Sequence, residues 1–198
     1  MDWMNRPAVA PTWSRGRAAP EFSEQLRLAA AGDDAAFESL VGPLLGRLEG
    51  YLRAQAGPAA DDLRSDVLLA LFQSLGRFHG DESGFRSWVF TIAHHRIVDH
   101  RRRSRVHETL EHVGQIPSAG PLPDDEAVAR RGVEELQAIL ESLPGAQRQV
   151  LLLRTVADLS VEQTADAIGK SIGAVKLLQH RAVVTLRRRL ERRESELS

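Results

Sequence analysis

Apolar residues recur at intervals of three and four positions along most of this chain, which is the spacing of amphipathic helices. Between residues 24 and 75 the recurring positions are Leu26, Ala29, Ala30, Phe37, Leu40, Val41, Leu44, Leu45, Leu48, Tyr51 and Leu52. No stretch alternates apolar and polar residues for long enough to predict a β-strand. The pattern therefore predicts an all-α fold built from packed helices.

Two further helices are predicted before residue 105. After the break "AGPAADD", Asp61 or Asp62 can cap a helix whose stripe is Val67, Leu68, Leu71 and Phe72. After the turn "HGDESG", a helix opens at Phe85 and runs to Arg103. Its buried arc is expected to hold Trp88, Val89, Ile92, Ala93 and Arg96, with Ser87, Thr91, His94, His95 and Arg102 largely opposite.

A segment rich in glycine and proline, "VGQIPSAGPLP", follows these helices and indicates a linker between two domains. Helical spacing resumes through Val133, Leu136, Ile139 and Leu140, and again through Val150, Leu151, Leu153 and Arg154. The prediction is two small helical domains joined by a flexible linker. Its boundaries are a disordered tail over 1–22, an amino lobe over 23–105, an acidic linker over 106–126 and a carboxyl lobe over 127–194.

The charge distribution matters more than the net charge of -1. Arginines crowd the end of the amino lobe and the end of the carboxyl lobe, while residues 106–129 carry no lysine or arginine and five acids. Two basic poles around an acidic connector fit two phosphate-binding surfaces, and they also fit two solvated helix ends.

The composition limits the class of protein. The chain has no cysteine, so a disulfide framework and a thiolate nucleophile are excluded and a reducing, cytoplasmic compartment is expected. No run approaches the roughly 18 apolar residues of a membrane span, and the first residues do not have the pattern of a secretory signal.

The carboxyl lobe holds the most informative motif, "LSVEQTADAIGKSIGAVKLLQHRAVVTLRRRL". Ser160 and Gln163 have capping-box spacing, and Gly169 can end this short helix in a left-handed conformation. Ser171 can then cap a second helix with the inner stripe Val175, Leu178, Ala182 and Leu186. Two short helices around a tight turn predict a helix-turn-helix, whose second helix enters the DNA major groove.

The outer face of the second helix carries the candidate DNA contacts. They are Ser171, Gly173, Ala174, Lys176, Leu177, His180 and Arg181. Small residues at the amino end allow close approach to DNA, and the two cations can contact phosphates or guanine edges. An ordinary helical hairpin with a basic face would explain the charge but not the capped turn.

The ordered set of segments resembles the extracytoplasmic-function sigma factors, group IV of the sigma-70 family of RNA polymerase subunits. In the amino lobe the resemblance rests on "AFESLVGPLL", "ADDLRSDVLLALFQSL" and "FRSWVFTIAHHRIVDHRRR". In the carboxyl lobe it rests on "LPGAQRQVLLLR", "LSVEQTADAIG", "SIGAVK" and "HRAVVTLRRRL". It covers about residues 24 to 190.

The resemblance implies a role for each segment. The family's polymerase-binding surface would be formed by Asp61, Asp62, Leu63, Asp66, Val67 and Leu71. The reader of the minus-ten promoter element would be formed by Arg86, Trp88, His95, Arg96, His100, Arg101, Arg102 and Arg103. The helix that begins at Ser171 would read the minus-thirty-five element, and the linker would thread toward the polymerase active site.

The resemblance also implies partners. They are core RNA polymerase, promoter DNA and an anti-sigma protein, with no cofactor, metal or small-molecule substrate and no catalysis by the chain alone. Two departures from the family pattern stand out: Ser65 replaces a common glutamine, and His94-His95 replaces a common Arg-Asn pair. The second departure affects which bases are read.

Three other interpretations compete with this one. A stand-alone helix-turn-helix regulator could share the carboxyl lobe, but the helical, basic amino lobe argues against it. A nuclease is disfavoured because the acids at 61, 62 and 66 lie beside an apolar stripe and no phosphate-cradling loop exists. A metal site among His94, His95, Asp99 and His100 is disfavoured because only His95 and Asp99 share a helix face.

Overall fold

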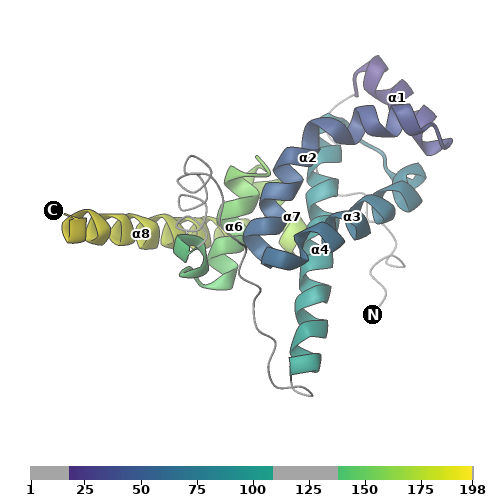
Figure 1. The fold of residues 1–198 in the computed structure, drawn as a ribbon. Coiled ribbons are helices and arrows are strands. Elements are labelled where there is room, and N and C mark those ends of the chain that lie inside the picture. Colours follow the sequence, from purple (N-terminus) through teal and green to yellow (C-terminus); the bar gives the residue numbers. More distant parts are fainter. Residues whose placement is uncertain (1–17, 109–137, 198) are drawn as a thin grey trace.

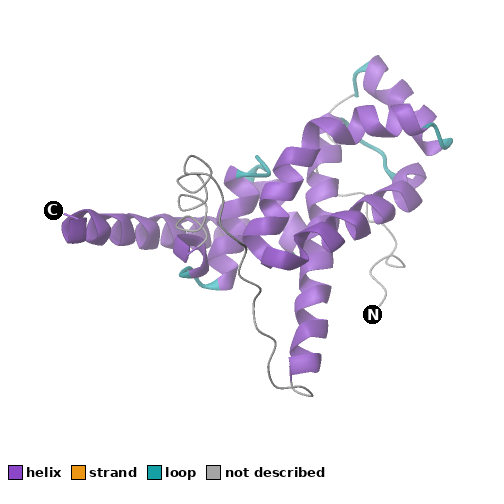
Figure 2. Ribbon diagram, viewed as in Figure 1, coloured by secondary structure: helices purple, strands orange, loops and turns teal. Residues whose placement is uncertain are grey.

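The computed structural model describes residues 18–108 and 138–197, and within these ranges the chain forms helices and turns without a strand (Figures 1 and 2). The helices are α1 (Pro20–Ala30), α2 (Asp34–Ala56), α3 (Ala60–Ser74), α4 (Glu82–Glu108), α6 (Gly145–Thr155), α7 (Val161–Ile168) and α8 (Ile172–Leu197). Short 3-10 turns cover Gly57–Ala59 and Leu75–Arg77. The all-α prediction is confirmed.

Helix starts differ from the predictions at two places. Neither Asp61 nor Asp62 caps α3, because the helix begins at Ala60 after the 3-10 turn and both acids lie in its first turn. There their carboxylates face the positive end of the helix dipole. Helix α4 begins at Glu82 rather than Phe85, since Asp81 Oδ1 accepts the backbone N–H of Gly84 at 2.7 Å and so caps the first turn.

Aromatic rings fix the amino end of α4 against the rest of the amino lobe. Phe85 makes edge contacts with Phe22 and Phe78, with ring centroids 5.8 and 5.4 Å apart. Trp88 stacks on Phe78 at 5.1 Å. This cluster orients the first turns of α4, where the predicted promoter-melting surface begins.

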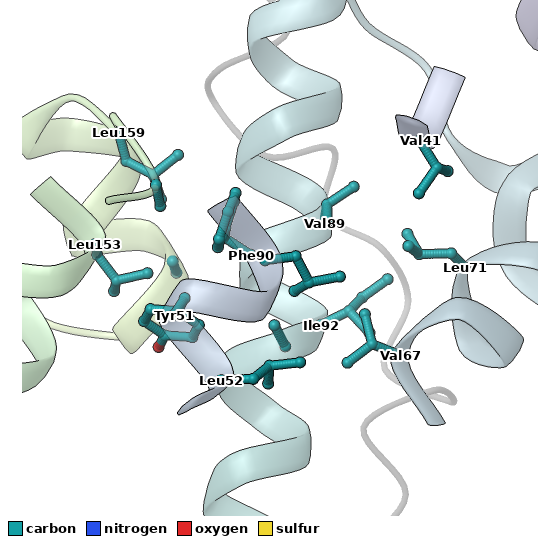
Figure 3. Packing of buried hydrophobic residues seen from close by; sticks show 14 of the residues in the cluster. Val41, Tyr51, Leu52, Val67, Leu71, Val89, Phe90, Ile92, Leu153 and Leu159 are labelled. Atoms are coloured by element: carbon teal, nitrogen blue, oxygen red, sulfur yellow. The ribbon is translucent and has the colours of Figure 1, made fainter. Parts of the chain in front are cut away.

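One apolar core runs through both lobes. Leu153 and Leu159 of the carboxyl lobe are fully buried in the same cluster as Tyr51 and Phe90 of the amino lobe (Figure 3). Helix α7 packs on α4, and α6 packs on α2 (Figure 1). The two helical domains are thus present, but the structure holds them together as one body.

The predicted linker lies largely outside the described residues. Its first three positions, 106–108, continue α4 as helix, and the described chain resumes at residue 138. Helix α8 also extends past the predicted recognition helix and projects from the carboxyl lobe (Figure 1).

Candidate nucleic-acid interface

The helix-turn-helix forms as its capping and turn residues predict. Ser160 Oγ accepts the backbone N–H of Gln163 at 3.1 Å, and the Gln163 side chain accepts the Ser160 N–H at 2.8 Å. Gly169 ends α7 in the left-handed region with φ 64°. Ser171 Oγ then accepts the N–H of Ala174 at 3.2 Å at the start of α8. These caps fix the angle at which α8 leaves α7.

The first turns of α8 divide into a buried face and an exposed face, as predicted. Val175 and Ala182 are fully buried, and Leu178 and Leu186 are half-buried. The side chains offered to solvent are Ser171, Gly173, Lys176, Leu177, His180 and Arg181, with Ala174 half-buried at the edge. A cationic face at the amino end of a helix is suited to a phosphate backbone and base edges.

The second candidate surface lies on α4, and its residues are not equally available. Arg102 and Arg103 are exposed at the basic end, and Arg102 pairs with Asp99 at 3.6 Å. Trp88, His95, Arg96 and His100 are half-buried. Arg86 is only 28% exposed and points toward the other lobe, where its Nη1 lies 3.6 Å from Asp158 Oδ2.

Arg101 has a structural contact that the sequence does not reveal. Its Nη2 donates to both the main-chain oxygen and the Oε1 of Gln55, each at 2.7 Å. Gln55 is buried near the end of α2, so this arginine ties α4 to α2. The predicted presentation of Arg101 to DNA is therefore limited, because much of the guanidinium faces the protein.

The prediction that Ser87 and His94 lie on the open side of α4 is wrong, because both are buried. His94 lies against Gln149 of α6, whose Nε2 is 3.1 Å from His94 Nε2. The pKa of His94 is lowered to about 4, mainly by burial and in addition by the positive charge of the neighbouring His95 and Arg101. Helical periodicity does not predict this burial, because the carboxyl lobe covers α4 on a second side.

The exposed face of α3 is the third candidate surface. Asp61, Asp62 and Asp66 are exposed, whereas Leu63, Val67 and Leu71 lie in the core and support the helix from within. The apolar side chains that this face offers to a partner are instead Leu69 at 55% exposed and Phe72 at 46%. Leu69 is not among the residues expected from the sequence, although its spacing of three from Asp66 and from Phe72 places it beside each of them on the helix surface.

Two classes of site are not found in the described residues. No group of three or more histidine, aspartate or glutamate side chains is arranged to hold a metal ion in residues 18–108 and 138–197. Over the same ranges no helix combines the length and the apolar character needed to cross a bilayer.

The fold and these surfaces define a two-lobed helical protein with a helix-turn-helix, a basic helix and an exposed acidic and apolar helix. Models of two sigma-70 families match the chain: sigma-70 region 2 over residues 37–106 and sigma-70 region 4 over residues 133–186.

Curated relatives that are similar over most of this chain belong to the same family. The ECF RNA polymerase sigma factor SigD of Mycobacterium tuberculosis is 33% identical over 168 residues, which cover 80% of this chain and 79% of SigD. SigX of Bacillus subtilis, also an ECF RNA polymerase sigma factor, is 32% identical over 69% of this chain and 73% of its own. The chain therefore belongs to the ECF RNA polymerase sigma factors, and the stand-alone regulator is not favoured.

Solved structures share the fold. CnrH, solved in complex with the cytosolic domain of CnrY, superposes with a TM-score of 0.63 at 22% identity and covers 85% of this chain and 96% of its own. The sigma factor RpoE of Bartonella quintana, solved with the anti-sigma factor NepR, gives 0.59 at 20% identity and covers 87% and 98%. Both matches span the two lobes.

Proposed function

We propose that this sigma factor binds core RNA polymerase through α3, melts the minus-ten element with α4 and reads the minus-thirty-five element with the first turns of α8. The observation that carries this assignment is the capped helix-turn-helix with Lys176, Leu177, His180 and Arg181 exposed on one face. It stands in one chain with a second basic helix, so two DNA contacts are available to a single subunit.

On the polymerase side, the contact surface is the exposed face of α3. Asp62, Asp66, Leu69 and Phe72 supply acids around an apolar centre, which suits a partner surface with basic residues around an apolar patch. Leu63, Val67 and Leu71 hold this helix in place from the core side.

At the minus-ten element, α4 contributes affinity through four basic side chains, the exposed Arg102 and Arg103 and the half-buried Arg96 and His100. Trp88 and His95 lie on the same helix, beside the DNA that it binds. Phosphate contacts give affinity while displaced bases give specificity.

The lobes correspond to residues 23–105 and 127–194, with the segment 106–126 connecting them. The protein acts in the cytoplasm as a non-catalytic initiation subunit, and an anti-sigma protein that covers both lobes is its inhibitor.

The test is co-elution with bacterial core RNA polymerase followed by run-off transcription from a pool of promoter templates. We expect binding and defined start sites, which would also identify the two promoter elements. Binding to duplex DNA without binding to polymerase would instead establish a stand-alone regulator.

A matched pair of arginine variants tests the minus-thirty-five assignment. Arg181→Ala should weaken promoter binding by the holoenzyme about tenfold, because one guanidinium contact to DNA is lost. Arg53→Ala removes another exposed arginine, on α2, and should change nothing. Equal effects of the two substitutions would mean that α8 contributes only general positive charge.

A further inference from the structure

Helix α8 continues past the part that packs on the carboxyl lobe. Ala182 is fully buried and Leu186 is half-buried, whereas the described side chains beyond Leu186 are all exposed. The match to sigma-70 region 4 also ends at residue 186, although the helix runs on to Leu197 and projects from the lobe (Figure 1). We call residues 187–192 the α8 arm. Packing within the lobe does not account for it.

The α8 arm is strongly basic on all sides. Its four arginines are exposed, and they outnumber a single exposed acid, Glu191: the arginines are Arg187, Arg188, Arg189 and Arg192. None of the ion pairs found among the described residues involves these arginines. Four guanidinium groups are therefore available to a partner.

The position of the charge within α8 argues against a role in stabilising the helix end. Cations interact favourably with the carboxyl end of the helix dipole only within the last turn. Arg188 lies nine residues before Leu197, which is about 2.5 turns from the end of the helix. The dipole therefore does not explain the arginines of the arm, and their charge points to a ligand.

Two arginines of the arm continue the helix face that we assign to DNA. Arg188 and Arg192 follow Arg181 by seven and eleven residues, and these spacings are close to two and three whole turns. Arg181 and Arg192 are about 16 Å apart along the helix axis, and the major groove is about 12 Å wide. A helix that crosses the groove with its first turns on the bases therefore brings the arm to the phosphate backbone that borders the groove.

The composition of the arm favours nucleic acid over a protein partner. Protein interfaces have an apolar core from which charged residues are depleted. Leu190, which is 50% exposed, is the one apolar side chain described in the arm. Phosphate contacts need only guanidinium groups within reach of the backbone, and they carry no sequence information. The arm fits a DNA backbone better than a protein surface.

We propose that the α8 arm binds the phosphate backbone of the duplex immediately upstream of the minus-thirty-five element, with Arg188 and Arg192 as the main contacts. The arm projects away from the amino lobe, to which the downstream minus-ten element is assigned (Figure 1). This inference rests on the proposed function, since it supposes that the first turns of α8 read the minus-thirty-five element. The arm adds affinity without adding sequence specificity.

Two promoter duplexes test the inference, each bound by the holoenzyme formed from the full chain and core polymerase. Both carry a promoter recovered in the run-off experiment. The shorter duplex ends at the upstream edge of the minus-thirty-five element, and the longer one extends about 10 base pairs, or one helical turn, further upstream. Only the longer duplex offers phosphates to the arm.

The double variant Arg188→Ala/Arg192→Ala should bind the longer duplex about tenfold more weakly at about 0.1 M salt, and the slope of log K against log salt should become shallower by about 1.8. Its affinity for the shorter duplex should equal that of the unmodified chain. Arg188→Lys/Arg192→Lys keeps both charges and should retain most of the affinity. Glu191→Gln removes the acid of the arm and should tighten binding to the longer duplex.

Equal affinities of the alanine variant and the unmodified chain for the longer duplex would overturn the inference. An equal loss on both duplexes would also overturn it, because the arm would then contact the polymerase or another protein. Failure of the proposed function gives a different result: the unmodified holoenzyme would bind both duplexes no better than a duplex with a scrambled minus-thirty-five element.

Discussion

Arg101 Nη2 lies 2.7 Å from both the main-chain oxygen and the side-chain oxygen of Gln55, so the first arginine of the basic run on α4 anchors the helix. The next two arginines are exposed. Three identical neighbours in the sequence therefore have two different surroundings in the fold.

Replacing these arginines one at a time should separate stability from promoter opening. Arg101→Ala should lower the free energy of unfolding by about 2 kcal/mol, because it removes charge-assisted bonds to a buried partner. Arg102→Ala and Arg103→Ala should each change it by less than about 0.5 kcal/mol and should reduce promoter opening. Urea titrations and a permanganate footprint of the melted element measure the two effects. An unfolding curve for Arg101→Ala that overlays the unmodified one would contradict the anchoring role.

The buried His94 should make the protein less stable as the pH falls. Its pKa is about 4 in the fold, against about 6.5 in an unfolded chain, so the unfolded state takes up the proton first as the pH drops. Stability should thus be lost between pH 6.5 and pH 4, with about 2 kcal/mol lost between pH 7 and pH 5.

The comparison that isolates this effect uses two glutamine variants. His94→Gln should have a shallower pH dependence of unfolding than the unmodified chain, whereas His79→Gln, at an exposed position, should keep the original slope. Parallel slopes for His94→Gln and the unmodified chain would show that other groups set the pH dependence.

The exposed apolar residues of α3 should matter for polymerase binding and not for folding. Leu69→Asp should abolish co-elution with core polymerase while the melting temperature changes little, because the side chain is 55% exposed. Leu190→Asp, at a leucine that is 50% exposed on α8, is the matched control and should co-elute normally. If both variants bind polymerase, the contact lies on another surface.

The capping box should contribute a measurable part of the stability of the helix-turn-helix. Ser160→Ala removes the acceptor of the Gln163 N–H and should cost about 1 kcal/mol. Ser160→Asp keeps an acceptor at the same place and should cost much less. Chemical denaturation followed by circular dichroism measures both, and equal losses would show that the cap is not the cause.

The local features of the site were predictable from the sequence because neighbouring residues determine them. The serine cap, the left-handed glycine and the buried valine at 175 follow from spacing within one or two turns. The surroundings of Arg101 and His94 were not predictable in the same way. Their partners, Gln55 and Gln149, are 46 and 55 residues away, and no helical periodicity reports such contacts.

The face of α3 was misjudged for a related reason. A stripe of apolar residues shows which side of a helix is buried, but Leu69 and Phe72 widen that stripe beyond the core. The sequence pattern alone does not distinguish an apolar residue that is buried in the core from one that is exposed and available to a partner.

Helix α4 carries both contacts to the other lobe and the residues proposed to contact DNA, which has an evolutionary consequence. A mutation at Ser83, Arg86 or His94 alters a contact with the other lobe and also the helix proposed to read the promoter. In descendants of this chain these positions should therefore change in pairs, each with its partner on α6, α7 or the turn between them. Residues that lie far apart in the gene thus limit one another's freedom to vary.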